Sequence, residues 1–212
     1  MSVKVKICGT RTLEGTQGAV EAGADFLGFI FVHSSKRYIE AEKAKPIIDA
    51  VRGKIAVVGV FENPIPHRVN ELVRYLGLEY VQLHGAETNE YCQTIQASVI
   101  KAFRLPSNVT FDEARNKLRE YKVEYHMVDR EKQAPIQSGQ RIGEMVDPDL
   151  AAKLAKEFSL FYSGGLTPEN VSEVVQKVAP FAVDVAGGIE TNGEQDQNKI
   201  REFVRKAKEI RN

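Results

Sequence analysis

Two residues that can move protons stand at the ends of short apolar segments. Cys8 ends segment 3–8, and Asp129 ends segment 123–129. A thiol acts as a base or nucleophile once it is ionised, and a carboxyl group acts as a general acid when burial raises its pKa toward the working pH. If both segments are parallel strands, their carboxyl ends meet at the face where such folds hold their active sites.

Each of these residues also has a simpler interpretation. Cys8 could be a small buried hydrophobic residue, and Asp129 could cap a turn or pair with Arg130. A function is favoured for Cys8, because Gly9 and Thr10 lead into a predicted helix whose N–H groups and dipole favour a thiolate. Cys92 lies inside a predicted helix, where core packing is the better explanation.

The elements that must position these side chains alternate along the chain. Segments rich in Val, Ile, Phe and Tyr predict strands at 3–8, 25–31, 54–61, 79–84, 98–104, 123–129, 159–163 and 181–186. Capping residues predict helix starts at Thr12, Asn63, Asp147 and Thr167. The final helix is predicted at 195–210, with one apolar face formed by Ile200, Phe203, Val204 and Ala207.

This order of elements predicts an α/β fold, a single (β/α)8 TIM barrel in which residues 1–212 form one catalytic domain. The alternative is a doubly wound open sheet, which normally carries G-x-G-x-x-G after its first strand. The first strand here runs instead into Cys8-Gly9-Thr10-Arg11, so the barrel is favoured.

Composition limits the kind of partner. Lys and Arg total 29, and Asp and Glu also total 29, so the chain lacks the positive excess that nucleic acids and anionic membranes attract. The N-terminal segment carries Lys4 and Lys6, and no apolar run reaches the ~18 residues of a spanning helix. We therefore expect a cytoplasmic protein with a small-molecule partner, no nucleic acid, no membrane, and two free cysteines.

Two glycine pairs follow the last two predicted strands. Gly164-Gly165 and Gly187-Gly188 would let backbone N–H groups approach an anion, and phosphate sites in such barrels recur after strands seven and eight. The alternative is a pair of ordinary tight turns. Two pairs at the two expected positions favour a phosphorylated ligand.

Strand parity places further side chains inside the barrel. If Cys8 points inward, so does Lys6, and the same two-residue step turns Gln82 and Asp184 inward. A buried ammonium needs a partner, so we predict an ion pair between Lys6 and Asp184, with Gln82 near it. The alternative is that Lys6 leaves the barrel at its base.

Two other features carry less information. Residues 130–146 form a polar connection longer than most, which is either a lid over the barrel mouth or a surface insertion. The four histidines lack a recognisable ligand spacing, so no metal site is expected.

Five ordered segments together resemble one known family, the phosphoribosylanthranilate isomerases of tryptophan biosynthesis. They are Val5-Lys6-Ile7-Cys8-Gly9-Thr10, Ser35-Lys36-Arg37-Tyr38-Ile39, Val81-Gln82-Leu83-His84-Gly85, Ser163-Gly164-Gly165-Leu166-Thr167-Pro168-Glu169-Asn170-Val171 and Pro180-Phe181-Ala182-Val183-Asp184-Val185. The resemblance extends from the first predicted strand to the last, which makes it far more specific than any single motif.

The resemblance implies a cofactor-free Amadori rearrangement of phosphoribosylanthranilate to the corresponding aminoketose phosphate. It implies that Asp129 protonates the furanose ring oxygen and that Cys8, as a thiolate, removes the C2 proton. It also implies that Arg37 binds the anthranilate carboxylate. The remaining substrate-binding residues that it implies are His84, Asp184 and the phosphate-binding glycines Gly164, Gly165, Gly187 and Gly188.

The chain departs from the family pattern at two places. Where the family has a glycine-rich run with a lysine, this chain has Gln137-Ser138-Gly139-Gln140-Arg141, and neither Gln140 nor Arg141 is assigned that role. Ala186-Gly187-Gly188 replaces the usual Ser-Ser-Gly, so backbone donors must hold the phosphate there.

The alternative functions are those of another phosphosugar barrel enzyme, such as a ribulose-phosphate epimerase or indole-glycerol-phosphate synthase, and of a catalytically silent ligand-binding barrel. Monomer and homodimer both fit the sequence.

Overall fold

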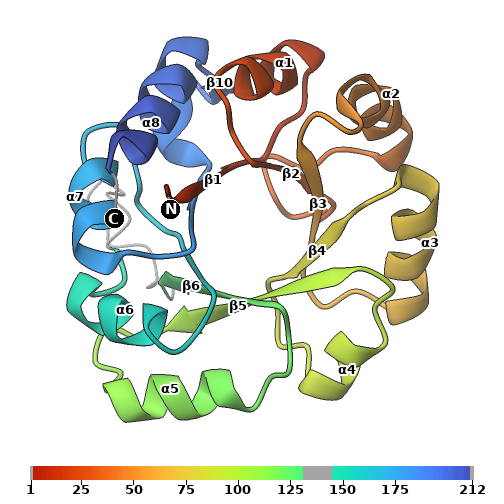
Figure 1. Cartoon of the computed structure of the whole chain (residues 1–212). Helices are drawn as coiled ribbons and strands as arrows, with labels where there is room; N and C mark the ends of the chain where they lie inside the picture. Colours follow the sequence, from red (N-terminus) through yellow and green to blue (C-terminus); the bar gives the residue numbers. More distant parts are fainter. Residues whose placement is uncertain (1, 131–144, 211–212) are drawn as a thin grey trace, which may run out of the picture.

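The computed structural model of this chain describes residues 2–130 and 145–210, which form a closed barrel of parallel strands inside a ring of helices (Figure 1). The strands of the barrel are β1 (Lys4–Cys8), β2 (Phe26–Ile30), β3 (Ala56–Phe61), β4 (Tyr80–Leu83), β5 (Ser98–Leu105), β6 (Tyr125–Arg130), β7 (Leu160–Tyr162) and β8 (Ala182–Val185). The helices are α1 (Leu13–Glu21), α2 (Ala41–Val51), α3 (Pro66–Leu76), α4 (Asn89–Gln93), α5 (Phe111–Arg119), α6 (Pro148–Ala155), α7 (Val171–Val178) and α8 (Gln197–Glu209). The predicted (β/α)8 barrel is confirmed.

Closure of the barrel comes from the pairing of its first and last strands. β1 lies between β2 and β8, with Val5 opposite Val183 and Lys6 opposite Asp184. An open doubly wound sheet would leave two edges, whereas here each barrel strand has a neighbour on both sides. All eight strands therefore present their carboxyl ends at one rim.

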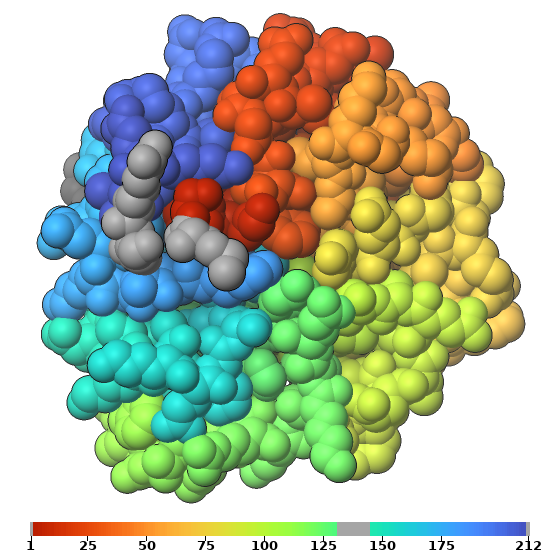
Figure 2. All heavy atoms as spheres, in the orientation of Figure 1, coloured from red at the N-terminus to blue at the C-terminus, as the bar shows by residue number. Residues whose placement is uncertain are grey.

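Alternating side chains fill two apolar layers. On β1, Val5 and Ile7 pack outward against the helices, while Cys8 belongs to the cluster inside the barrel. The other buried members of that inner cluster are Phe26, Val58, Val60, Ile100, Ala102, Met127, Phe161 and Ala182. Side chains thus occupy the centre of the ring on the face shown in Figure 2. The predicted inward parity of Cys8 is confirmed.

Two of the four predicted helix starts are confirmed. The Thr12 side chain accepts a hydrogen bond from Gly15 N–H at α1, and the Asp147 side chain accepts one from Asp149 N–H at α6. Asn63 and Thr167 were wrong as helix starts, because α3 begins at Pro66 and α7 begins at Val171.

Loop contacts explain both errors. Asn63 has a left-handed backbone with φ 49°, and its side chain accepts a hydrogen bond from Ala86 N–H in the loop after β4. The Thr167 hydroxyl accepts a hydrogen bond from Glu169 N–H within a turn that precedes the helix. In both cases a polar side chain typical of a cap organises a loop instead.

The chain ends in the predicted amphipathic helix. α8 buries Ile200, Phe203, Val204 and Ala207, as expected, and Asp196 caps its first turn. A short antiparallel pair of strands, β9 (Glu190–Thr191) and β10 (Glu194–Gln195), precedes the helix and was not predicted. Among the described residues, no helix combines the length and apolar character needed to cross a membrane.

Asp25 fastens the amino-terminal side of the barrel. Its carboxylate accepts hydrogen bonds from Val5 N–H at 2.9 Å and from Lys4 Nζ at 2.9 Å, and Lys208 Nζ of α8 lies 2.8 Å away. Burial raises the pKa of Asp25, but these three donors outweigh burial and hold the pKa below its ordinary value. The group therefore joins β1 to the last helix.

We predict that Asp25→Asn lowers the free energy of unfolding by about 1–3 kcal/mol at pH 7, since the charge-assisted hydrogen bonds are lost. Because the folded-state pKa is depressed, this stabilisation is present above the unfolded pKa of about 3.9 and disappears as the pH falls through the folded value. Urea unfolding at pH 7, 5 and 3 measures the difference between variant and wild type. Asp49→Asn, which removes an exposed paired carboxylate, serves as control and should change stability less. An unchanged difference from pH 7 to pH 3 contradicts this account.

Candidate active site at the carboxyl ends of the strands

Cys8 lies above a buried ion pair inside the barrel. Lys6 Nζ is 2.6 Å from Asp184 Oδ1, and the Lys6 side chain is fully buried. The Lys6 ammonium also lies close enough to Cys8 to lower the pKa of the thiol. Gly28 on the neighbouring strand leaves room for both groups, since a Cβ there would lie 2.8 Å from Cys8 Sγ and 3.0 Å from Lys6 Nζ. The predicted pairing of Lys6 with Asp184 is confirmed.

The charge state of Cys8 differs from the expectation. Burial raises the pKa of the thiol and Lys6 lowers it, while Asp184 raises it and Arg37 lowers it, and the net pKa lies above the ordinary value. Burial lowers the pKa of Lys6, but Asp184 and Cys8 outweigh burial and raise that pKa. Both shifts favour the protonated form, so the resting site holds an ammonium and a protonated thiol beside Asp184. The predicted preference for a thiolate was wrong for this state, because desolvation exceeds the effect of the nearby positive charges.

Asp129 and His84 meet across the same rim. His84 Nε2 lies 3.3 Å from Asp129 Oδ2, and both side chains are about one-fifth exposed. The other carboxylate oxygen, Oδ1, accepts a hydrogen bond from Arg130 N–H at 2.8 Å. A Cβ at Gly164 would lie 2.5 Å from Asp129 Oδ1, so this glycine lets the loop after β7 reach the carboxylate.

Gln82 orients the imidazole of His84. Gln82 precedes His84 by two residues, and its side-chain Nε2 lies 3.0 Å from His84 Nδ1. An amide nitrogen only donates, so this orientation of the amide makes Nδ1 the acceptor and assigns the ring proton to Nε2, the atom that faces Asp129. Gln82, His84 and Asp129 therefore lie in one row, in which Gln82 forms a hydrogen bond with His84 and His84 approaches Asp129 to 3.3 Å.

Arg37 reaches the rim from the loop after β2. Its Nε and Nη2 atoms donate to the two oxygens of Glu190, and Lys36 Nζ lies 3.3 Å from the same carboxylate. Burial raises the pKa of Glu190, but Arg37 and Lys36 outweigh burial and keep the pKa below its ordinary value. A Cβ at Gly9 would lie 2.4 Å from Arg37 Cδ, so the arginine crosses directly over the residue that follows Cys8.

Glu190 is a residue that the sequence analysis missed. Its signal was a single acidic residue directly after Gly187-Gly188-Ile189, in the segment that follows the last barrel strand. Paired with Glu190, the Arg37 guanidinium is held over the rim rather than extended into solvent. A Cβ at Gly187 would lie 3.1 Å from Arg37 Nη2, which puts the arginine beside one of the two glycine pairs.

The two glycine pairs lie close together. Gly164 and Gly165 have φ values of 86° and 70°, which favour glycine. A Cβ at Gly188 would lie 1.9 Å from the Leu166 carbonyl oxygen, so the loops after β7 and β8 touch through their backbones. The geometry forms one glycine-lined surface at the expected strand ends.

Several expectations fall elsewhere. The proposed lid, residues 130–146, includes Gln140 and Arg141 and lies for the most part outside the described residues, which end at 130 and resume at 145. Cys92 is buried in α4, away from the rim, and burial raises its pKa to about 11, in agreement with core packing. Within residues 2–130 and 145–210, no group of three or more His, Cys, Asp or Glu side chains is arranged to hold a metal ion.

Known proteins are similar to this chain in sequence and in fold. Residues 5–206 match the family described as N-(5'phosphoribosyl)anthranilate (PRA) isomerase. The chain is 43% identical over 208 residues to the N-(5'-phosphoribosyl)anthranilate isomerase of Geobacter sulfurreducens, an alignment that covers 97% of this chain and 98% of the other.

Solved structures agree with the sequence match. The phosphoribosyl anthranilate isomerase of Thermotoga maritima is 37% identical and superposes with a TM-score of 0.86, covering 98% of this chain and 100% of the other. An isomerase in complex with reduced 1-(o-carboxyphenylamino)-1-deoxyribulose 5-phosphate is 36% identical, with a TM-score of 0.83 and coverage of 98% and 100%. The family match covers nearly the whole chain, and Cys8, Asp129 and two glycine pairs lie at the rim of its barrel. This chain therefore belongs to the phosphoribosylanthranilate isomerase family.

Proposed function

We propose that this barrel converts N-(5'-phosphoribosyl)anthranilate, an aminoaldose, into 1-(2-carboxyphenylamino)-1-deoxyribulose 5-phosphate, an aminoketose, without a cofactor. The observation that carries the proposal is the juxtaposition at one rim of a thiol, an acid and two glycine-lined loops within a chain of this family. The related structure that contains a reduced form of this aminoketose supports the substrate class.

The rearrangement needs one proton given and one proton taken at neighbouring positions of the sugar. Asp129 gives its proton to the furanose ring oxygen, the C1–O bond breaks, and a Schiff base forms between C1 and the anthranilate nitrogen. Cys8, as the thiolate, then removes the proton from C2, and the electron pair moves to form an enolamine. Loss of the proton on the C2 hydroxyl and protonation of C1 give the ketone. Each acid or base of this kind contributes about 10²- to 10⁴-fold to the rate.

The ion pair beneath Cys8 supports the role of the base. When the thiol loses its proton, the thiolate lies beside the Lys6 ammonium, which lowers the thiol pKa. Asp184 keeps that ammonium in place at 2.6 Å and balances its charge while Cys8 is protonated. The base therefore alternates between two states with one fixed cation next to it, and Asp184 is part of the substrate-facing machinery that we propose.

The two anionic ends of the substrate, a carboxylate and a phosphate, bind at different places on the rim. Arg37 faces the anthranilate carboxylate, since a planar guanidinium binds a carboxylate at two points, and Glu190 holds the arginine in that position. The phosphate binds at Gly164, Gly165, Gly187 and Gly188, where backbone N–H groups can approach it closely. His84, beside Asp129, contacts the ring-opening end of the substrate.

The competing functions fit less well. A catalytically silent binding barrel would have no need for a thiol over a buried ion pair together with a carboxyl group at the opposite side of the same rim.

A cytoplasmic location is part of our proposal and is supported by two cysteines that are free and buried. Either a monomer or a homodimer is compatible with the site, and one relative from Thermotoga maritima is described as dimeric.

We predict that Cys8→Ser and Asp129→Asn each lower kcat by about 10²- to 10⁴-fold, with smaller changes in KM, because each variant removes a proton-transfer group. The test follows the loss of anthranilate-type fluorescence after freshly prepared phosphoribosylanthranilate is added. Cys92→Ala, which alters the thiol in the core of α4, is the control and should retain activity. Wild-type turnover in either site variant refutes the role of that residue, and no turnover by the wild type refutes the proposed function.

We predict that Arg37→Met raises KM by about 10- to 100-fold, since hydrogen bonds to charged groups contribute about 1.5–3 kcal/mol. kcat should change less, because the anthranilate carboxylate takes no part in the proton transfers. The matched control is Lys36→Met, which removes the neighbouring, exposed cation of Glu190. The role of Arg37 is wrong if the two variants give the same KM.

We predict that Cys8 titrates at a higher pH than an ordinary thiol, because burial raises its pKa. The base must be deprotonated, so kcat/KM should rise with pH toward the midpoint of this titration. Thiolate absorbance at 240 nm between pH 6 and 11 measures the titration in a Cys92→Ala background, and Cys8→Ser in the same background gives the tyrosine baseline. A midpoint near or below pH 7 contradicts the effect of burial.

A further inference from the structure

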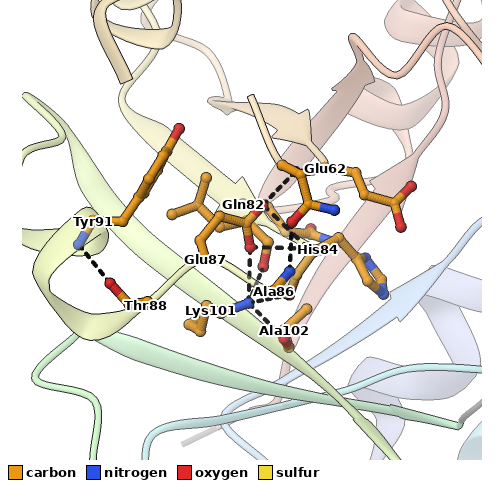
Figure 3. Close-up of polar contacts among 12 residues, drawn as sticks. Glu62, Gln82, His84, Ala86, Glu87, Thr88, Tyr91, Lys101 and Ala102 are labelled. Carbon is orange, nitrogen blue, oxygen red and sulfur yellow. Dashed lines mark hydrogen bonds and ion pairs between the residues drawn. The ribbon is translucent and has the colours of Figure 1, made fainter. Parts of the chain in front are cut away.

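A second buried ion pair lies on the outer side of the barrel strands, between β5 and the loop after β4. Lys101 Nζ lies 3.0 Å from Glu87 Oε2, and both side chains are 1% exposed. Ile100 and Ala102 point into the barrel, so Lys101 between them points outward, beneath the loop after β4. Figure 3 shows the pair at the centre of a network that reaches His84. None of the reaction steps above involves either residue.

The ammonium holds the backbone on both sides of His84. Lys101 Nζ donates to the carbonyl of Leu83 at 3.3 Å and to the carbonyl of Gly85 at 2.8 Å. It also donates to Ala102 O at 3.1 Å, which anchors the lysine on its own strand. One charged group therefore fixes the residues immediately before and after His84.

The carboxylate holds the same loop from the other side. Glu87 accepts hydrogen bonds from Gly85 N–H at 3.0 Å and from Asn63 N–H at 2.7 Å. Asn63 in turn accepts a hydrogen bond from Ala86 N–H at 2.7 Å. The loops after β3 and β4 are thereby joined through Glu87.

Stability does not account for this arrangement. Removing two charges from water is costly, and a buried ion pair is often no more stable than a well-packed apolar pair of the same volume. What the pair supplies is a fixed direction for the backbone around His84. That direction places His84 Nε2 3.3 Å from Asp129 Oδ2 while Gln82 holds Nδ1.

We propose that Glu87 and Lys101 are positioning residues that hold His84 against Asp129, the acid of the proposed isomerisation. They touch no substrate and act through the backbone of residues 83–85. The inference rests on the proposed function for its kinetic consequence, whereas the effect on His84 is measurable in the free protein.

The decisive variant is Glu87→Gln combined with Lys101→Met. It leaves no buried charge, and the glutamine oxygen still accepts from the backbone of the two loops, but the contacts to the carbonyls of Leu83 and Gly85 are lost. We expect kcat for phosphoribosylanthranilate to fall by about 10- to 100-fold with KM changed less, because small displacements of groups at a reacting centre reduce rates by such factors. Leu154→Ala, in the buried face of α6, serves as a control for lowered stability and should leave kcat unchanged at a temperature where it is folded.

A second measurement separates positioning from stability. In ¹⁵N-histidine spectra of the ligand-free protein, with His84 assigned by comparison with His84→Asn, the wild type should show a single tautomer protonated at Nε2. The double variant should show the averaged shifts of two tautomers, while Leu154→Ala keeps the wild-type shifts. If the double variant fails to fold, both measurements are made on Lys101→Met alone, which removes the same contacts to the two carbonyls and leaves a Glu87 carboxyl that protonation can neutralise, with the same direction expected.

The outcomes are distinguishable. Native kcat and unchanged His84 shifts in the folded double variant overturn the proposal. A wild type that does not turn over phosphoribosylanthranilate refutes the proposed function, and the histidine spectra then still decide whether the pair holds His84.

Discussion

The chemistry of this barrel depends on a single buried contact, the ion pair between Lys6 and Asp184. An ammonium ion inside a barrel is unfavourable unless a carboxylate meets it, and the pairing of β1 with β8 places these two residues opposite each other. The contact therefore joins the strands that close the barrel to the site of the proposed base. The same ammonium lies beside the Cys8 sulfur, so the strand pairing that completes the fold also determines where negative charge is tolerated at the rim.

The rim is organised as two groups that have different electrostatics. Around Cys8, one cation lies below the thiol and Arg37 crosses above the next residue, so positive charge offsets part of the effect by which burial raises the thiol pKa. Around Asp129, the imidazole and a backbone N–H face the carboxylate, and Gly164 lets the loop after β7 approach it closely. Cys8 and Asp129, the base and acid that we propose, thus lie in separate environments at one rim.

Sequence patterns predicted the barrel strands well, because each is a short segment rich in buried apolar or aromatic residues. Strand parity also predicted the partner of Lys6, since a period of two determines which side chains enter a barrel. The pKa of Cys8 was not predictable, as its sign depends on how completely the thiol is removed from water. The partners of Arg37 and Asn63 depend on loop paths, which bring Glu190 and Ala86 to them from other parts of the chain. Lys101 did carry a signal, a charge inside an apolar strand, but its outward direction had no predictable partner.

The distance along the chain between Lys6 and Asp184 has a consequence for biosynthesis. Their positions differ by 178 residues, so the first strand leaves the ribosome long before its last neighbour exists. At synthesis rates of about 5–20 residues per second, Lys6 waits on the order of ten seconds or more without its counter-ion. The nascent amino-terminal half can form several strand–helix units, but the thiol gains its finished surroundings only when translation has nearly ended. Catalytic competence is therefore acquired late and all at once.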